Sequence, residues 1–130
     1  MSRENLQEWY DFVESPDSWV LSDMIADDAV FYSPVVHTPQ KGKALMHMYL
    51  SAAEKVLGGD TFEYVGEYLS DTGAVLEFTT MIDGIEIDGI DMITWNSDGK
   101  ISEFKVMLRP LKAVNKVHDL MHEMLTSLKL

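Results

Sequence analysis

Asp91 is the residue of this 130-residue chain whose surroundings most favour acid–base chemistry. It lies in the segment 90–95, where strand alternation places Asp91, Ile93 and Trp95 on one face. The other face carries Ile, Met and Thr side chains, so the carboxyl is expected to be buried whichever face is inside. A buried carboxylate is costly unless it is paired or protonated. Asp91 is therefore either a hydrogen-bonded structural aspartate or a pocket group acting as acid, base or ligand anchor.

The charge state of Asp91 follows from the same surroundings. The nearest basic residue that follows it in the sequence is Lys100, beyond the next turn. Burial without a cation disfavours the ionised form, so the pKa of Asp91 is expected to rise above the reference value of ~3.9. A protonated Asp91 would donate a hydrogen bond to a carbonyl oxygen, whereas an ionised one would act as a base.

Three other groups could take part in chemistry. His37, in the loop 36–40, is either a proton-exchanging partner of Asp91 or an ordinary loop histidine. Ser33 could orient a ligand or a water, but no adjacent histidine supports nucleophilic serine catalysis. The i, i+4 pair His118 and His122 is spaced as in a metal-binding helix. Aspartate replaces the usual glutamate and no third ligand is evident, so no metal site is predicted.

Composition restricts the remaining classes of function. Ten basic and twenty-two acidic residues give a net charge of −12, which disfavours nucleic-acid and anionic membrane partners. The lack of cysteine excludes disulfides, thiolate nucleophiles and iron–sulfur clusters. No apolar run approaches the ~18 residues of a membrane span, and the N-terminal residues lack a signal-peptide pattern. We expect a cytoplasmic protein that uses no cofactor.

The elements that must position these groups can be read from apolar periodicity. Spacings of three and four predict helices at the front of the chain and one at its end, over residues 3–14, from Ser15-Pro16 to Asp27-Asp28, from Gly42 to Gly58, and after Pro110. Alternation predicts a short strand over 29–33 and four long strands between 61 and 109. The turn signals between the long strands are Asp71-Thr72-Gly73, Asp83-Gly84 and Asp98-Gly99. Asp88-Gly89, inside the third long strand, indicates a bulge.

These elements predict one α+β domain over residues 1–130. Three N-terminal helices would pack on a strongly curved antiparallel sheet, with a C-terminal helix added. Along the last strand, Phe104, Val106 and Leu108 should face the helices, and Lys105 and Met107 should face outward.

Three segments of the chain resemble the nuclear transport factor 2-like superfamily. They are the run 25–34 (IADDAVFYSP), Gly42-Lys43 at the start of a helix, and 90–101 with its Asp98-Gly99 turn. Over about residues 5–110 the chain is similar to SnoaL-like proteins, a group related to polyketide cyclases and ketosteroid isomerases. The resemblance implies a cystatin-like cone with a mixed sheet, an apolar pocket on its concave face and a homodimer formed through the outer face.

The resemblance transfers the ketosteroid isomerase residues only in part. The oxyanion-hole aspartate of that enzyme matches Asp91, but its catalytic base falls on Ser33. Its oxyanion-hole tyrosine falls on Trp9, and Tyr10 next to it points in another helical direction. Because serine cannot abstract a proton at neutral pH, these departures argue against classical ketosteroid isomerisation.

The layout also implies which side chains bound the pocket. Ser33, His37 and Asp91 would be its polar points, and its walls would be Trp9, Phe31, Tyr49, Trp95, Phe104 and Leu108. The expected ligand is a small hydrophobic carbonyl compound, acted on by a cofactor-free cyclase, isomerase or hydratase with Asp91 and His37 as the exchanging pair. The alternatives are a non-catalytic protein that binds a hydrophobic ligand and a protein-interaction module of the same fold.

Overall fold

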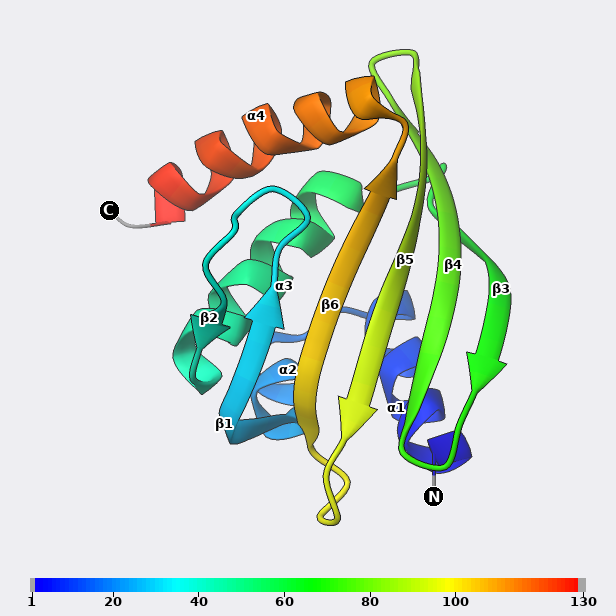
Figure 1. The fold of residues 1–130 in the computed structure, drawn as a ribbon, viewed down its shortest axis with the longest axis vertical. Helices are drawn as coiled ribbons and strands as arrows, with labels where there is room; N and C mark the ends of the chain where they lie inside the picture. The colour runs from blue at the N-terminus through cyan, green and yellow to red at the C-terminus, as the bar shows by residue number, and fades with distance from the viewer. Residues whose placement is uncertain (1, 129–130) are drawn as a thin grey trace.

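A computed structural model describes residues 2–128, in which helices cover one face of a curved six-stranded sheet (Figure 1). The elements are, in chain order, α1 (Ser2–Glu14), α2 (Ser18–Met24), β1 (Ile25–Tyr32), β2 (Gln40–Lys41), α3 (Lys43–Leu57), β3 (Glu63–Leu69), β4 (Gly73–Ile82), β5 (Ile85–Trp95), β6 (Ile101–Arg109) and α4 (Leu111–Leu128). The strand order is β2-β1-β6-β5-β4-β3. Strands β1 and β6 run parallel and the other neighbours antiparallel, so the predicted α+β class with a mixed sheet is confirmed.

The helices lie mainly on one side of the sheet. α1, α2 and α3 lie behind it in Figure 1, and α4 crosses one end. The second helix begins two residues later than predicted. Its N-cap is Asp17 and not Ser15, because the Asp17 carboxylate accepts hydrogen bonds from the backbone N–H groups of Trp19 and Val20. No helix in the described part of the chain is long and apolar enough to span a membrane.

The boundary between α2 and β1 differs from the prediction. The second helix ends at Met24, and Ile25 already pairs with Ile101 of β6. The pairing shifts register between Ile25 and Val30, and the two aspartates in that stretch are exposed. Parallel pairing with β6 thus overrides the helical spacing that extended to Asp27-Asp28.

The long strands follow the predicted turns, with one correction. β4 and β5 pair without a break from Gly73↔Thr94 to Ile82↔Ile85, so Asp88-Gly89 forms no bulge. The glycine is explained instead by close packing. A Cβ at position 89 would lie 2.6 Å from the Phe78 ring and 2.7 Å from the Leu108 side chain.

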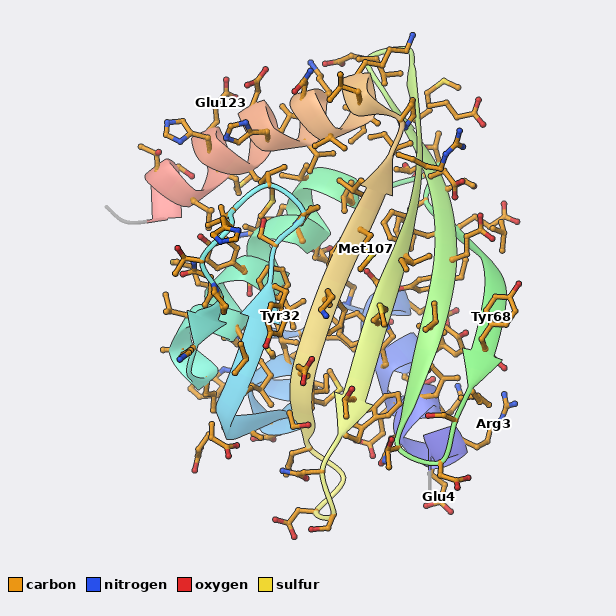
Figure 2. The ribbon with its side chains drawn as sticks, viewed as in Figure 1. Arg3, Glu4, Tyr32, Tyr68, Met107 and Glu123 are labelled. Atoms are coloured by element: carbon orange, nitrogen blue, oxygen red, sulfur yellow. The ribbon has the colours of Figure 1, made fainter. Side chains whose placement is uncertain are left out.

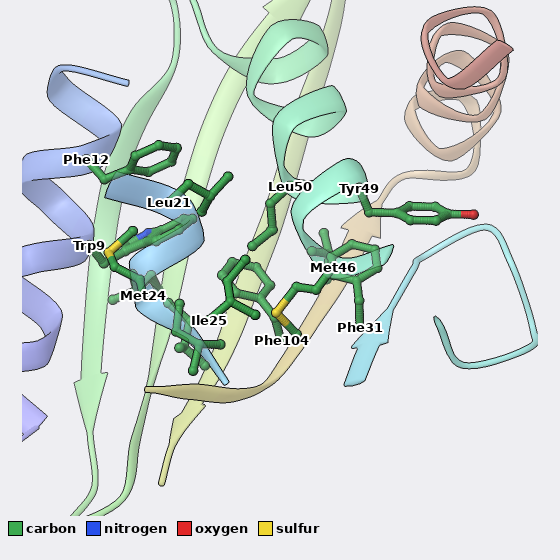
Figure 3. Packing of buried hydrophobic residues seen from close by; sticks show 14 of the residues in the cluster. Trp9, Phe12, Leu21, Met24, Ile25, Phe31, Met46, Tyr49, Leu50 and Phe104 are labelled. Atoms are coloured by element: carbon green, nitrogen blue, oxygen red, sulfur yellow. The ribbon is translucent and has the colours of Figure 1, made fainter. Parts of the chain in front are cut away.

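The two faces of the sheet differ in the way that alternation predicts. On β6, Phe104 and Val106 are buried beneath the helices, while Met107 is exposed on the outer face (Figure 2). The core cluster centres on the aromatic rings of Phe31 and Phe104, whose centroids are 6.1 Å apart, with Met46 fully buried nearby (Figure 3).

Gly89→Ala is expected to lower the free energy of unfolding by about 1–3 kcal/mol, since the added methyl overpacks the core against Phe78 and Leu108. Chemical denaturation measures the change. Glu86→Ala, at an exposed position of the same strand, is the control and should change stability by less than about 0.5 kcal/mol. A Gly89→Ala protein as stable as the wild type would contradict the packing explanation.

Candidate functional site

A cavity of about 430 Å³ lies between α1, α3 and the inner face of the sheet. This volume is in the range of small-molecule sites, ~300–1,000 Å³. Its walls are mostly apolar, being formed by Trp9, Phe12, Val13, Leu50, Ala53, Leu57, Phe62, Phe78, Phe104 and Val106. Its polar side chains are Tyr64, Asp91, Glu14 and Glu54. The cavity is therefore an apolar container with a few polar anchors.

The Asp91 carboxyl is the buried polar group of this cavity. The residue is 7% exposed, and Tyr64 donates a 2.6 Å hydrogen bond from its hydroxyl to Asp91 Oδ2. The Trp9 indole N–H in turn donates to the Tyr64 oxygen at 3.0 Å. Among the described residues Asp91 Oδ1 receives no bond, and none of their fully buried side-chain polar atoms is unpaired. Oδ1 is thus open to the cavity and able to contact a ligand.

A bulge in β3 brings Tyr64 to this position. Tyr64 pairs with Phe78 and Gly66 pairs with Glu77, which leaves Val65 as the extra residue. Phe78 in turn pairs with Gly89, two residues before Asp91 on β5. Tyr64 therefore reaches diagonally across β4 to the carboxyl.

Aromatic packing holds the Tyr64 ring in this diagonal position. The centroid of its ring lies 5.0 Å from that of Phe62, edge to face, and 6.3 Å from that of Phe78. Phe62 also stacks on Phe78 at 5.1 Å. The donor to Asp91 is thus fixed by an apolar cluster.

Burial sets the charge state of the site. Removal from water raises the pKa of Asp91 from 3.8 to about 7, and the Tyr64 hydrogen bond lowers it by a smaller amount. The pKa of Tyr64 is raised well above 10, first by its own burial and then by the neighbouring Asp91. Among residues 2–128, no lysine, arginine or histidine lines the cavity. Tyr64 thus remains a protonated donor, while Asp91 exchanges a proton near neutral pH.

The structure brings together some of the residues that the sequence suggested for the pocket. Trp9, Phe104 and Asp91 line one cavity. Trp9 packs against Phe104 with ring centroids 5.1 Å apart, and the cavity lies beside this contact. Phe31 is buried behind Phe104 and does not line the cavity. Trp95 and Leu108 do not line it either: Trp95 is two inner-face positions beyond Asp91, and Leu108 covers Gly89 instead.

Ser33 and Tyr49 line a different hollow of about 200 Å³, beneath α4. Figure 3 shows the Tyr49 hydroxyl pointing out of the core cluster, while its ring stacks on Phe31 at 5.2 Å. His118 and His122 border the same hollow, and the described residues contain no group of three metal-ligating side chains. His37 is exposed in its loop and lines neither space. The structure therefore does not place Ser33 or His37 beside Asp91.

Tyr64 is the site residue that sequence reasoning missed. Its partner is 27 positions away, and the contact depends on the bulge at Val65. Gly66, an isolated glycine inside the strand, is a signal for a bulge, but it does not show which side chain meets Asp91. A second signal was the alternation of Phe62 and Tyr64 at the start of a strand, which places two aromatic rings on one face.

Asp91→Asn is expected to become more stable than the wild type as pH rises. Below about pH 4 the carboxyl is protonated in both folded and unfolded chains. Between 3.8 and about 7 only the unfolded chain releases the proton, so wild-type stability falls by up to about 4 kcal/mol in total. Asn cannot ionise and avoids this loss. Denaturation of both proteins at several pH values measures the gap, and a gap independent of pH would contradict the raised pKa.

Comparison with known proteins agrees with this fold. A steroid delta-isomerase from Pseudomonas aeruginosa is 32% identical, with a TM-score of 0.90 over 97% of this chain and 92% of the other. An uncharacterised protein with a cystatin-like fold from Silicibacter pomeroyi is 24% identical, with a TM-score of 0.83 over 92% and 83%.

A more distant structure is the epoxide hydrolase/cyclase-like enzyme SalBIII of salinomycin pyran-ring formation. It is 16% identical, with a TM-score of 0.65 over 83% of this chain and 90% of the other, and shows the fold alone. The comparison with curated proteins gave no match. The family model of the SnoaL-like domain matches residues 6–104. The chain therefore belongs to the SnoaL-like family, and it shares its fold with a nuclear transport factor 2-like protein from Mesorhizobium loti.

Proposed function

We propose that this protein is a cofactor-free acid–base enzyme that binds a small apolar carbonyl compound in the Asp91 cavity. The observation that carries the proposal is a buried carboxyl without a cation, with one oxygen open to an apolar space. A proton-transfer group is most effective when its pKa lies near the working pH, and burial brings the pKa of Asp91 to about 7.

In the proposed reaction Asp91 carries the proton. Its ionised form removes a proton from the carbon next to the substrate carbonyl, which leaves an enolate, and the protonated form returns the proton to another position. Tyr64 keeps its own proton and fixes the carboxyl by donating to Oδ2, while Trp9 fixes Tyr64. The apolar walls orient the substrate and exclude water.

The steroid delta-isomerase that is 32% identical to this chain supports this class of reaction, because isomerisation of a steroid is a change at an apolar molecule. The proposal does not extend to steroid isomerisation by a base at the Ser33 position. Ser33 has no acidic side chain, and it borders the separate hollow beneath α4. His37, exposed in its loop, has no role in the proposed step.

The direct test uses 2-tetralone as a small apolar ketone and follows exchange of its α-hydrogens in D₂O by NMR. The wild type is expected to catalyse exchange, with a pH profile whose midpoint is about 7. Asp91→Asn should lower the rate by about 10²–10⁴-fold, the usual contribution of general base catalysis. Tyr64→Phe should move the midpoint to higher pH. The hydrogen bond from Tyr64 lowers the pKa of Asp91 in the wild type, so its loss raises that pKa.

Asp88→Asn is the matched control, since it makes the same chemical change on the same strand but on the outer face. It should exchange tetralone at the wild-type rate. Wild-type binding of tetralone without exchange would reject the enzyme and leave a ligand-binding protein. Equal rates for Asp91→Asn and wild type would reject Asp91 as the proton carrier.

We also propose that two copies of the chain pair through the outer face of the sheet. Three large apolar side chains are exposed there: Met81 at 51%, Met107 at 48% and Tyr68 at 67%. Across the strands Val75 pairs with Met92, which adds further apolar surface between them. A monomer would leave this apolar surface in water, and a second copy would cover it.

Sedimentation equilibrium at micromolar concentration is expected to give twice the chain mass of 14.7 kDa. Met107→Glu should shift the protein toward the monomer, because it buries a charge in the pair. Val20→Glu, which adds the same charge at an exposed position on α2, should leave the mass unchanged. A wild-type protein that sediments as a monomer would reject the proposed pairing.

A further inference from the structure

The opening of the Asp91 cavity can be located from the exposure of its lining residues. Those contributed by β4, β5 and β6 are buried, among them Phe78 and Phe104. Those contributed by the end of α1 and the end of α3 include Glu14, Pro16 and Gly58, which are exposed. A ligand therefore enters between the C-terminal ends of these two helices.

The two charged side chains that line the opening are both acidic. Glu14 is the last residue of α1, and Glu54 lies in the last turn of α3. Both side chains line the cavity, and no basic side chain of the described part of the chain does. The C-terminal end of a helix also carries a partial negative charge from its free carbonyl groups. The two helix ends and the two carboxylates thus all favour a positively charged group at the opening.

As formed by residues 2–128, the interior of the cavity has no group that would favour an anionic ligand over a cationic one. Asp91 is the charged group of the floor, and its open Oδ1 is an acceptor when ionised. Lys55, the basic residue of the last turn of α3, is exposed and does not line the cavity. A ligand carboxylate would find no cation among the described residues that line the cavity, and it would lose hydration on entry.

We propose that the cavity is selective for apolar carbonyl compounds that carry a positively charged amine, and that Glu14 and Glu54 determine this selectivity. The ammonium group lies between the two carboxylates at the opening, and the apolar body with its carbonyl occupies the interior. The inference rests on the proposed function, because it assumes that this cavity holds the substrate. It adds a substrate class that the acid–base step does not require.

Three probes with one ring system separate charge from shape: 1-naphthylmethylamine, 1-naphthylmethanol and 1-naphthoate. Calorimetric titration at neutral pH and low salt is expected to rank them as amine, alcohol and carboxylate. The amine should bind about tenfold more tightly than the carboxylate, from weak charge pairs added to two helix ends. Added salt should reduce this ratio, because the opening is exposed to solvent.

Two double variants separate the effect of the carboxylates at the opening from the effect of the net charge of the protein. In Glu14→Gln/Glu54→Gln the ratio of amine to carboxylate affinity should fall to about two or less, with alcohol binding unchanged. Glu4→Gln/Glu123→Gln removes the same number of charges at the start of α1 and on α4 (Figure 2), and should keep the wild-type ratio.

Each other result has one meaning. Wild-type binding of naphthoate as tight as that of the amine overturns the selectivity, and the proposed function stands because the cavity is occupied. Equal loss of the ratio in both double variants assigns the effect to net charge and overturns the role of the opening. Failure of all three probes to bind overturns this inference, and the exchange of 2-tetralone then decides separately whether the proposed function stands.

Discussion

The burial of the Asp91 carboxyl without a cation is the constraint on which the site depends. Holding it in an apolar cavity costs about 4 kcal/mol above neutral pH, whereas a domain is stable by only ~5–15 kcal/mol. The remaining core must offset this cost, and Phe31, Phe78 and Phe104 are almost completely buried. The hydrogen bond from Tyr64 reduces the cost without removing it, since it stabilises the ionised form less than burial destabilises it.

The bulge at Val65 supplies that hydrogen bond and also attaches α1. On one side of it Tyr64 faces inward to Asp91, and on the other Glu67 pairs with the buried Leu76 and faces the same way. The Glu67 carboxylate accepts hydrogen bonds from Arg3 and Tyr10 of α1. Uninterrupted alternation would turn one of these two side chains to the outer face. One extra residue in β3 thus orders both the floor of the cavity and its wall.

The sequence predicted the parts of the site that depend on local pattern. The inward direction of Asp91 follows from alternation alone, and its raised pKa follows from apolar neighbours within five residues. The position of the cavity could not be predicted in this way, because it depends on packing between distant elements. Tyr49 and Ser33 satisfied the same patterns, yet α4 encloses them in a second hollow. A glycine at position 89 inside a strand could be recognised as unusual from the sequence. The need for it, close contact with Phe78, becomes visible only when the neighbouring strand is placed.

Asp88 and Asp91 show why residue type alone does not assign the chemistry. They lie three positions apart on β5 and therefore face opposite sides of the sheet. Asp88 lies on the outer face, where it forms an ion pair with Arg109 of β6 at 3.4 Å and a hydrogen bond with Glu77 of β4. No cation among the described cavity residues lies beside Asp91, so its carboxylate is neutralised by binding a proton. Asp91 can exchange a proton near neutral pH inside the cavity, whereas Asp88 does not line the cavity and cannot reach a ligand there. The alternation of side chains along β5 turns Asp91 toward the cavity, and no lysine, arginine or histidine among the described residues of the cavity wall pairs with it there.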